Sequence, residues 1–304
     1  MSKGTVDIVG VPLDLGANIR GSNMGPATIR VADLHRQIEV LGFATEDLGD
    51  IAVPYREQIA KADRSQNYLS VIEKIVAQLA EITKKSIEAG HIPLTIGGDH
   101  TVAIGSISGV SSALHAKGKN LGLIWVDAHA DLNTPETSPT GNIHGMPLAV
   151  VLGKGHKSLT SIGGSFAKVR PQNVALIGIR SIDNDERELC KSSGIRYFTM
   201  REIDEKGLSK VMEEAIQVAS KDTDGIHLSF DLDAIEPLYA PGVSTPVTGG
   251  LSHREAHLCL EMIADSKKLL SMDFVEVNPM TDIDHKTAKL TVDFILSALG
   301  KSII

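Results

Sequence analysis

Short apolar, β-branched runs alternate with amphipathic stretches along most of this chain. Two of the amphipathic stretches, Tyr68–Gly90 and Leu208–Lys221, carry apolar residues three and four positions apart and therefore predict helices. Strands that alternate with helices are typical of an α/β fold with a mostly parallel sheet. Seven runs have the length and composition of buried strands: VDIVGV (Val6–Val11), IPLTIGG (Ile92–Gly98), LGLIWVD (Leu121–Asp127), VALIGIR (Val174–Arg180), IRYFTM (Ile195–Met200), GIHLSFDLD (Gly225–Asp233) and LLSMDFVEVN (Leu269–Asn278).

The composition fits this fold and argues against several kinds of partner. Aromatic residues make up only 4% of the chain, so the core must rest on Ile, Val, Leu and Ala, as in parallel sheets. The formal net charge is −8 and no long basic block occurs, which argues against nucleic acid as a partner. No apolar run approaches the roughly 18 residues of a membrane span, and the N-terminus reads as a first strand rather than a signal peptide.

The two cysteines and the absence of linkers bear on compartment and domain number. Cys190 and Cys259 do not form a CxxC pair, which favours a reducing cytoplasm over a disulfide framework. No linker, low-complexity segment or internal repeat divides the chain. We therefore expect a single domain over residues 1–304.

Ionisable side chains follow four of the predicted strands, at the point where each strand ends. Ligands bind at the carboxyl ends of strands in open α/β sheets. If the backbone there is extended, residues two apart share a face and lie roughly 6–7 Å from each other, so that their side chains can converge on a cation. The four sets are Asp99–His100, Asp127/His129/Asp131, Asp231/Asp233 and Glu276–Asn278.

Two histidines and four aspartates form a donor set of nitrogen and oxygen without thiolate. Such a set suits Mn²⁺, and less strongly Fe²⁺, Co²⁺ or Zn²⁺. Four carboxylates balance two divalent ions, and two such ions would hold a bridging water and ionise it near neutral pH. A lone DxH or DxD motif is more often a loop or a helix cap. Three such clusters, each directly after an apolar run, favour a two-metal site.

Other polar motifs have simpler explanations. His253 and His257 are spaced as in a helical zinc site, but Ser252 and Glu255 form a capping box that accounts for the start of a helix there. TDIDHK (Thr281–Lys286) precedes an apolar helical stretch, so its acids suit a helix start. GKGHKS and GVPLDLG lack the spacing of phosphate-binding loops.

The strand-end motifs resemble those of the ureohydrolases, the arginase and agmatinase family. The resemblance rests on GGDH (Gly97–His100), DAHAD (Asp127–Asp131), SFDLD (Ser229–Asp233) and EVNP (Glu276–Pro279), in order along nearly the whole chain. Within the family, NTPETSPTGNIHGMPLA (Asn133–Ala149) is similar to the arginase branch, particularly the bacterial one. The resemblance implies one α/β/α domain with a parallel sheet of about eight strands, assembled as trimers or hexamers. It also implies two Mn²⁺ ions per subunit, with His100, Asp127, His129, Asp131, Asp231 and Asp233 as ligands.

The resemblance assigns the amino-acid end of a substrate site to a polar loop and the segment around Asp183. Asn133, Ser138 and Thr140 lie where arginases bind the α-carboxylate of L-arginine. Asp183 lies where they hold the α-ammonium group, with Glu186 nearby. The simpler alternatives are a turn around Pro139 for the loop hydroxyls and a cap for Asp183.

Further roles are implied for residues nearer the metal ligands. Glu276 lies where a carboxylate pairs with the guanidinium group, and His144 lies where a histidine shuttles a proton, although it could be an ordinary loop histidine. Asp131 could relay a proton, and Thr245 belongs to an STPV segment similar to one of the family. Glu236 departs from the family pattern, which commonly has Asp there.

The implied activity is hydrolysis of L-arginine to L-ornithine and urea by a metal-bridging hydroxide. Thr140 stands where Ser is common, which bears on substrate affinity but not on the metal ligands. One alternative is another guanidino hydrolase, such as an agmatinase or a guanidinobutyrase. The other is a non-catalytic, metal-stabilised binding or scaffold protein of the same fold. The complete ligand set together with His144 and Glu276 favours the enzyme.

Overall fold

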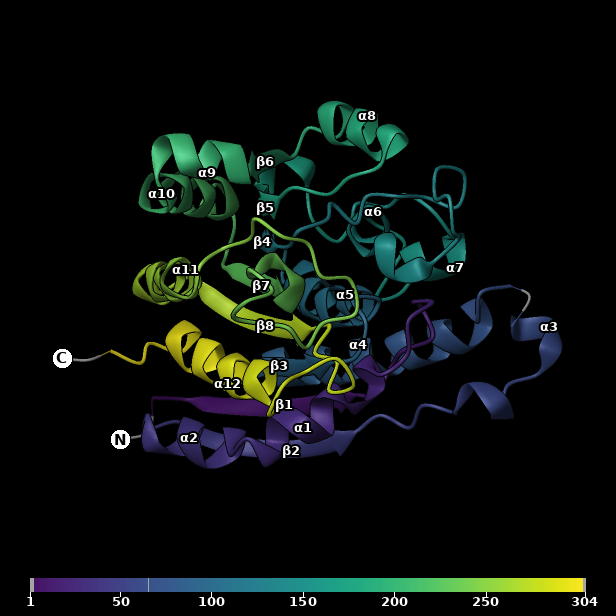
Figure 1. The fold of residues 1–304 in the computed structure, drawn as a ribbon, viewed down its shortest axis with the longest axis horizontal. Coiled ribbons are helices and arrows are strands. Elements are labelled where there is room, and N and C mark those ends of the chain that lie inside the picture. The colour runs from purple at the N-terminus through teal and green to yellow at the C-terminus, as the bar shows by residue number, and fades with distance from the viewer. Residues whose placement is uncertain (1–2, 65, 303–304) are drawn as a thin grey trace.

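All strands of the fold lie in one parallel sheet. The computed structural model describes residues 3–64 and 66–302. Over these residues eight strands form a sheet in the order β2-β1-β3-β8-β7-β4-β5-β6, and every neighbouring pair is parallel (Figure 1). The strands are β1 (Thr5–Val11), β2 (Ala44–Asp50), β3 (Ile92–Gly97), β4 (Gly122–Val126), β5 (Val174–Ile179), β6 (Arg196–Thr199), β7 (Ile226–Asp231) and β8 (Leu269–Val275).

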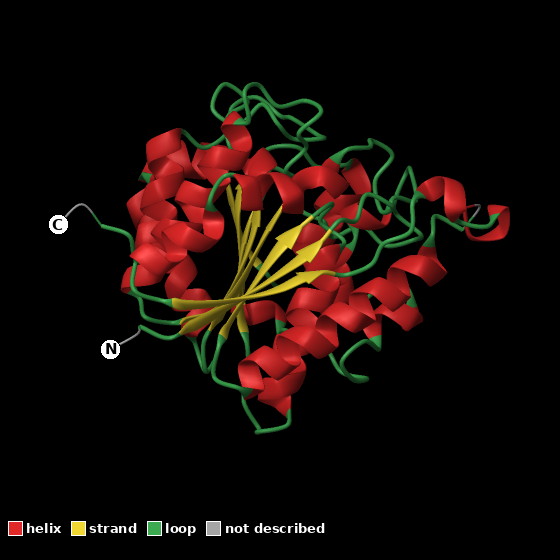
Figure 2. Ribbon diagram, turned by 90° about the horizontal axis from the view of Figure 1, so that it is seen from below, coloured by secondary structure: helices red, strands yellow, loops and turns green. Residues whose placement is uncertain are grey.

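Helices cover both faces of the sheet (Figure 2). On one face α4 packs against α5, and on the other α10, α11 and α12 form a row that α1 extends. The helices are α1 (Gly25–Val31), α2 (Leu34–Val40), α3 (Lys61–Arg64), α4 (Leu69–Glu88), α5 (Val102–His115), α6 (Pro147–Val151), α7 (Lys157–Thr160), α8 (Asn184–Ser192), α9 (Met200–Lys206), α10 (Leu208–Ser220), α11 (His253–Asp265) and α12 (Lys286–Ala298). The predicted α/β class is confirmed.

The two helical layers explain why the strands are apolar along their whole length. In β4, Ile124 and Val126 point into the core beneath α10–α12, whereas Leu123 and Trp125 point into the core beside α5 and α6. All four side chains are fully buried. A strand that is covered on both faces has no solvent side, so the apolar positions are continuous rather than alternating.

The sequence did not indicate strand β2, which forms one edge of the sheet. Its sequence, ATEDLGD, is polar and its side chains are mostly exposed, because only β1 pairs with it. Two predicted strands were also too long at their carboxyl ends. β7 ends at Asp231 and continues into a 3-10 turn, η5 (Leu232–Ala234), and β8 ends one residue before Glu276.

The helices were also tested for length and hydropathy. None of the helices in the described residues is both long and apolar enough to cross a membrane.

Candidate active site

The four ligand-bearing segments follow four strands that are adjacent in the sheet. The central part of the strand order is β3-β8-β7-β4, and the segments after these strands carry His100, Glu276, Asp231 and Asp127 respectively. Their carboxyl ends meet at one edge, as the sequence predicted. Gly98 permits a tight approach there, since a Cβ at this position would overlap the carbonyl of Leu13.

The candidate ligands form two triads that share Asp127. One triad is His100, Asp127 and Asp231, and the other is Asp127, His129 and Asp233; within each, the ligand atoms lie within 4.8 Å of one another. Two adjacent triads with a common carboxylate are suited to a pair of divalent cations. The shared carboxylate is itself fixed, because the indole Nε1 of Trp125 donates to Asp127 Oδ2 at 2.9 Å.

The imidazole of His100 faces the first position with an unpaired nitrogen. Nδ1 lies 3.2 Å from carboxylate oxygens of Asp127 and Asp131 and 3.1 Å from one of Asp231. It is fully buried and makes no hydrogen bond with any residue that the structure describes. A buried nitrogen that converges with three carboxylates but donates to none of them fits a metal ligand, and Asp131 therefore joins the first triad.

The second position is framed by His129 and Asp233. His129 Nδ1 lies 3.0 Å from Asp233 Oδ2 and 3.5 Å from Asp127 Oδ1. Asp233 is oriented from both sides, because Oδ1 accepts from the backbone N–H of Ala128 at 3.2 Å and Oδ2 accepts from the Thr245 hydroxyl at 3.0 Å. Thr245 thus contacts a candidate ligand directly, in addition to lining the cavity described below.

Burial of so many carboxyl groups perturbs their protonation. Burial and mutual repulsion raise the pKa values of Asp131, Asp231 and Asp233. Burial acts on Asp127 in the same direction, but the two neighbouring histidines, His100 and His129, outweigh it and lower the pKa of that carboxyl. The cluster therefore attracts positive charge, either as protons or as divalent cations with mixed nitrogen and oxygen ligands.

Glu276 has a carboxylate oxygen without a partner. Oε1 accepts from the backbone N–H of His100 at 3.0 Å and contacts His144 Nδ1 at 3.1 Å, whereas Oε2 has no hydrogen bond with any described residue. The side chain is 1% exposed, and its backbone has the uncommon φ of +65°. Burial by itself would lower the pKa of His144, but the Glu276 carboxylate raises it to about 9.

A cavity of about 300 Å³ opens above the two triads. Asp127 and Glu276 are not part of its wall, but the other predicted ligands and every predicted substrate residue are. Its lining includes His100, His129, Asp131, Asp231, Asp233, His144, Asn133, Ser138, Thr140, Asp183, Glu186 and Thr245.

The polar loop at the outer part of the cavity is organised by local hydrogen bonds. Ser138 Oγ accepts from the N–H of Gly141, and Thr140 Oγ1 accepts from the N–H of Asn142, as the turn alternative anticipated. In both cases the hydroxyl hydrogen stays available to donate to a ligand.

Asp183 begins α8, but its side chain does not cap the helix. No side-chain capping hydrogen bond is formed there, which removes the simpler alternative for this residue. Its carboxylate instead lies 3.5 Å from Asn133 Nδ2, within the cavity wall. Glu186, one turn further on, accepts from the N–H of Leu132 at 3.0 Å, and burial raises its pKa to about 7.

Two assumptions about the ligand backbone were wrong. Asp131 has a φ of +51° and Asp233 lies within the 3-10 turn η5, so neither has the extended backbone that the spacing argument assumed. The ligands nonetheless converge, because the chain leaves β4 and β7 through tight turns at the same edge.

Two residues that support the site, Arg180 and Asp99, were given no role of their own on the basis of the sequence. The Arg180 guanidinium donates to the carbonyl oxygens of Asp233 at 2.7 Å and Ala234 at 3.1 Å. Asp99 is fully buried and accepts from the backbone N–H groups of Gly16 and Thr101. The sequence indicated these two residues only as charges beside a strand end, Arg180 in IGIR and Asp99 in GGDH.

The two histidines of α11 take no part in this site. Ser252 and Glu255 form the predicted capping box, the rings of His253 and His257 lie tilted against each other, and His257 Nδ1 contacts Ser297 Oγ at 2.8 Å. The acids before α12 also behave as a helix start, since Asp282 accepts from the N–H of Thr287.

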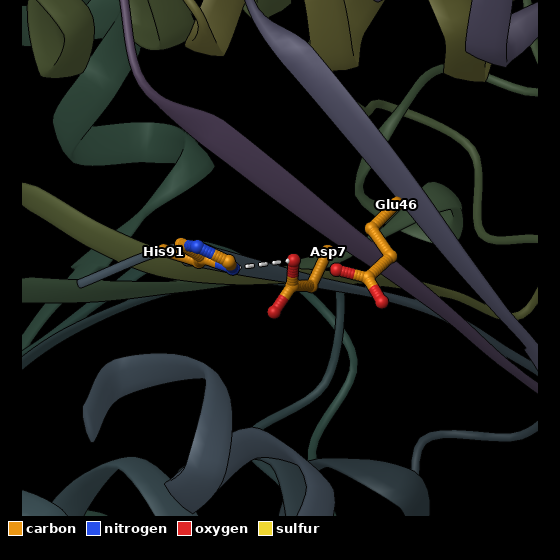
Figure 3. Close-up of side chains that lie close together, drawn as sticks. All are labelled: Asp7, Glu46 and His91. Atoms are coloured by element: carbon orange, nitrogen blue, oxygen red, sulfur yellow. Dashed lines mark hydrogen bonds and ion pairs between the residues drawn. The ribbon is translucent and has the colours of Figure 1, made fainter. Parts of the chain in front are cut away.

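A third group of ligand-type side chains, Asp7, Glu46 and His91, lies close together (Figure 3), near the amino ends of β1, β2 and β3. The oxygens of Asp7 are already taken, because Oδ1 is 2.9 Å from His91 Nδ1 and Oδ2 accepts from the Ser86 hydroxyl at 2.6 Å. This group is explained by an ion pair that joins β1 to the end of α4.

Comparisons with known proteins agree with the geometry. A model of the Arginase family matches residues 5–300. The chain is 49% identical to an arginase of Brevibacillus brevis over 98% of its own length and 99% of that protein. It superposes on the structure of an arginase from Bacillus caldovelox with a TM-score of 0.94 at 44% identity, covering 99% of this chain and 100% of the other. An arginase of Entamoeba histolytica in complex with L-ornithine gives a TM-score of 0.90 at 32% identity, covering 99% of both chains.

Proposed function

The chain belongs to the arginase family, and from this premise we propose that it hydrolyses L-arginine to L-ornithine and urea. The observation that carries the proposal is the unpartnered Oε2 of Glu276, next to two triads of candidate metal ligands. A buried anionic oxygen without a donor is costly. A guanidinium group is planar, cationic and able to donate to a carboxylate through two N–H groups, so it would remove that cost.

We propose that the six ligands hold two Mn²⁺ ions, although the same donors accept Co²⁺ or Fe²⁺. Four carboxylates and two imidazoles provide the charge and the donor types for two divalent cations. When bound, such a pair would lower the pKa of a coordinated water molecule and so supply a nucleophile near neutral pH.

The protein's own groups would orient the substrate and move the protons. Glu276 would fix the guanidinium plane through its free oxygen. Asp131, on the cavity wall, would accept a proton from the attacking water. His144, whose pKa is raised to about 9, carries a proton at neutral pH and would donate it to the amine that leaves as ornithine.

The outer part of the cavity would select an amino acid. Asn133, Ser138 and Thr140 offer an amide and two hydroxyl donors to the α-carboxylate, and Asp183 offers a carboxylate to the α-ammonium group. Glu186 and Thr245 complete this wall. Agmatine has a guanidinium group but no α-carboxylate, so these contacts would favour arginine over agmatine.

A urea-release assay decides between this proposal and its alternatives. The Mn²⁺-loaded protein should release urea from L-arginine faster than from agmatine or 4-guanidinobutyrate, and chelation should abolish the activity until Mn²⁺ is restored. Faster turnover of either other guanidine would identify a different guanidino hydrolase. No urea from any of the three would support the non-catalytic alternative.

We further propose that residues 1–304 act as one domain in the cytoplasm, and that the subunits assemble as trimers or hexamers. The family assignment and the two unpaired, buried cysteines support these proposals. Sedimentation of the purified protein would test the assembly.

A further inference from the structure

A row of buried polar side chains leads from the candidate metal centre into the middle of the sheet. It begins at His100, whose Nε2 lies 2.9 Å from Ser229 Oγ, and it continues to Asp273, His227 and Ser271. All five residues are at most 1% exposed. The last four come from neighbouring strands, where Ser229 is paired with Asp273 and His227 with Ser271.

The hydrogens in this row can be assigned from its donors and acceptors. A carboxylate only accepts, so Asp273 takes the Ser229 hydroxyl on Oδ1 at 2.6 Å and the Nε2–H of His227 on Oδ2 at 2.8 Å. Burial by itself would raise the pKa of Asp273, but the neighbouring His227 outweighs it and lowers that pKa, so the group is the anion. Ser271 then donates to His227 Nδ1 at 2.7 Å, and the side-chain polar groups of Ser229, Asp273, His227 and Ser271 all have partners.

The assignment determines which nitrogen of His100 carries the hydrogen. The single hydroxyl hydrogen of Ser229 is committed to Asp273, so its oxygen can only accept from His100. His100 therefore keeps a hydrogen on Nε2, and Nδ1 is the nitrogen that faces the three carboxylates around the first cation position, where its lone pair would bind a cation. Trp125 stacks on the ring with centroids 4.2 Å apart, which fixes the plane of the ring but not the position of the hydrogen.

We propose that Ser229, held by the Asp273–His227 pair, is a positioning residue that keeps His100 in the tautomer able to bind a cation through Nδ1. With the hydrogen on Nδ1 instead, the ring would point a proton at the cation. Partners behind a metal-binding histidine typically change metal affinity 10- to 100-fold. The sheet alone does not require this row, because an apolar pair in place of a buried ion pair is often no less stable. The inference rests on the proposed cation centre, but not on the reaction carried out there.

Two variants test separately the contact between Ser229 and His100 and the effect of the Asp273–His227 pair on Ser229. Ser229→Ala removes the acceptor of the His100 hydrogen and leaves the Asp273–His227 pair in place. The double variant His227→Leu/Asp273→Val keeps Ser229 but removes the group that commits its hydrogen. Thr291→Val is the matched control, because it removes another fully buried hydroxyl, which donates to the Thr287 carbonyl within α12 and not to a residue of the row.

The measurement is titration of each metal-free protein with Mn²⁺, with the free ion followed by electron paramagnetic resonance and folding followed by thermal melting. We expect Ser229→Ala and the double variant to bind one of two Mn²⁺ ions about 10- to 100-fold more weakly, because His100 belongs to only one triad. The other Mn²⁺ ion and the control should behave as in the parent protein.

Several results would overturn the inference. The role of Ser229 would be refuted if Ser229→Ala bound both Mn²⁺ ions as tightly as the parent protein. It would also be refuted if the variant lost the same affinity for both ions. Parent affinity in the double variant alone would refute the part assigned to Asp273 and His227. If the double variant fails to fold, the Mn²⁺ titration of Ser229→Ala alone tests the inference. A parent protein that binds two Mn²⁺ ions but does not cleave arginine would refute the proposed function and leave this inference intact.

Discussion

Replacing Glu276 with Gln tests the proposed function at its most specific point. The amide keeps an oxygen in the place of Oε1, so the hydrogen bonds from the His100 backbone and from His144 can persist. It puts an NH₂ group in the place of the unpartnered Oε2, where the guanidinium group would donate. A donor would then face a donor, while the packing around the side chain stays nearly unchanged.

The magnitude follows from what is removed. A hydrogen bond to a charged group contributes about 1.5–3 kcal/mol, and an unsatisfied donor adds about 1–3 kcal/mol. Because each 1.36 kcal/mol is a factor of ten in rate, kcat/KM for arginine should fall on the order of 100- to 10,000-fold. The variant also removes the carboxylate that raises the pKa of His144 to about 9. The loss of activity on the alkaline side should therefore begin roughly one to two pH units lower.

The assay is urea release across pH, with the metal content of each preparation measured. Asp7→Asn is the matched control, since Asp7 is another buried carboxylate paired with a histidine, His91, at the far end of the sheet. It should change the stability of the protein but not kcat/KM. A Glu276→Gln enzyme with both cations bound, near-parent kcat/KM and an unmoved alkaline limb would refute the role given to Glu276.

Four further outcomes are expected. Asp183→Asn should weaken kcat/KM roughly tenfold for arginine and for agmatine, which both carry an ammonium group, but not for 4-guanidinobutyrate, which lacks one; Asp185→Asn, outside the cavity wall, should change none of the three. In the metal-free protein the pKa of His144 is raised from 6.5 to about 9, so protonated His144 stabilises the folded state fully below pH 6.5. This stabilisation disappears as the pH rises through about 9. The difference in unfolding free energy between the parent and His144→Asn should therefore narrow by up to about 3 kcal/mol over that range. Ser252→Ala should cost about 1 kcal/mol in chemical denaturation without affecting Mn²⁺ binding, because it breaks only a capping box. Mn²⁺ binding at neutral pH should release protons, measurable in weakly buffered solution, from the carboxyls whose pKa values are raised; no release would contradict the crowding argument.

The strands with apolar runs were recognised from the sequence, and the polar edge strand was not. Seven of the eight strands carry such a run, which in the central strands reflects two helical layers, whereas β6 forms the other edge and is only partly buried. β2 has no such run, since it lies at the edge and its ATEDLGD side chains face solvent. Its place depends on pairing with β1, a long-range contact that local periodicity does not encode.

The site was foreseeable from strand ends, but its geometry was not. The charge that follows each apolar run pointed to His100, Asp127 and Asp231 at one edge. The sequence could not show that β3, β8, β7 and β4 are neighbours, which is what brings these groups together. It also could not show that Asp131 has a positive φ or that Asp233 lies in a 3-10 turn.

The turns after β4 and β7 need anchors that a strand would not need. Once Asp233 leaves the sheet for η5, the ladder no longer fixes its backbone, and Arg180 takes over by donating to the carbonyls of Asp233 and Ala234. The same guanidinium donates to the carbonyl of Val247 at 2.7 Å and so joins η5 to the segment that carries Thr245. Glu236, which departs from the family pattern, then secures the end of that segment.

Glu236 Oε2 accepts from the N–H groups of Gly249 at 2.7 Å and Gly250 at 3.0 Å. The substitution therefore lies in the structure that holds the second cation position and not in the wall of the cavity. Thr140, the other departure, lies in that wall, where its hydroxyl accepts from the Asn142 N–H and leaves its hydrogen for a ligand. A serine at position 140 could make both interactions, so the added methyl group changes the shape of the outer cavity and not its hydrogen bonding. The two residues thus lie in different parts of the site: Glu236 supports the segment next to the candidate ligand Asp233, and Thr140 shapes the outer wall of the cavity.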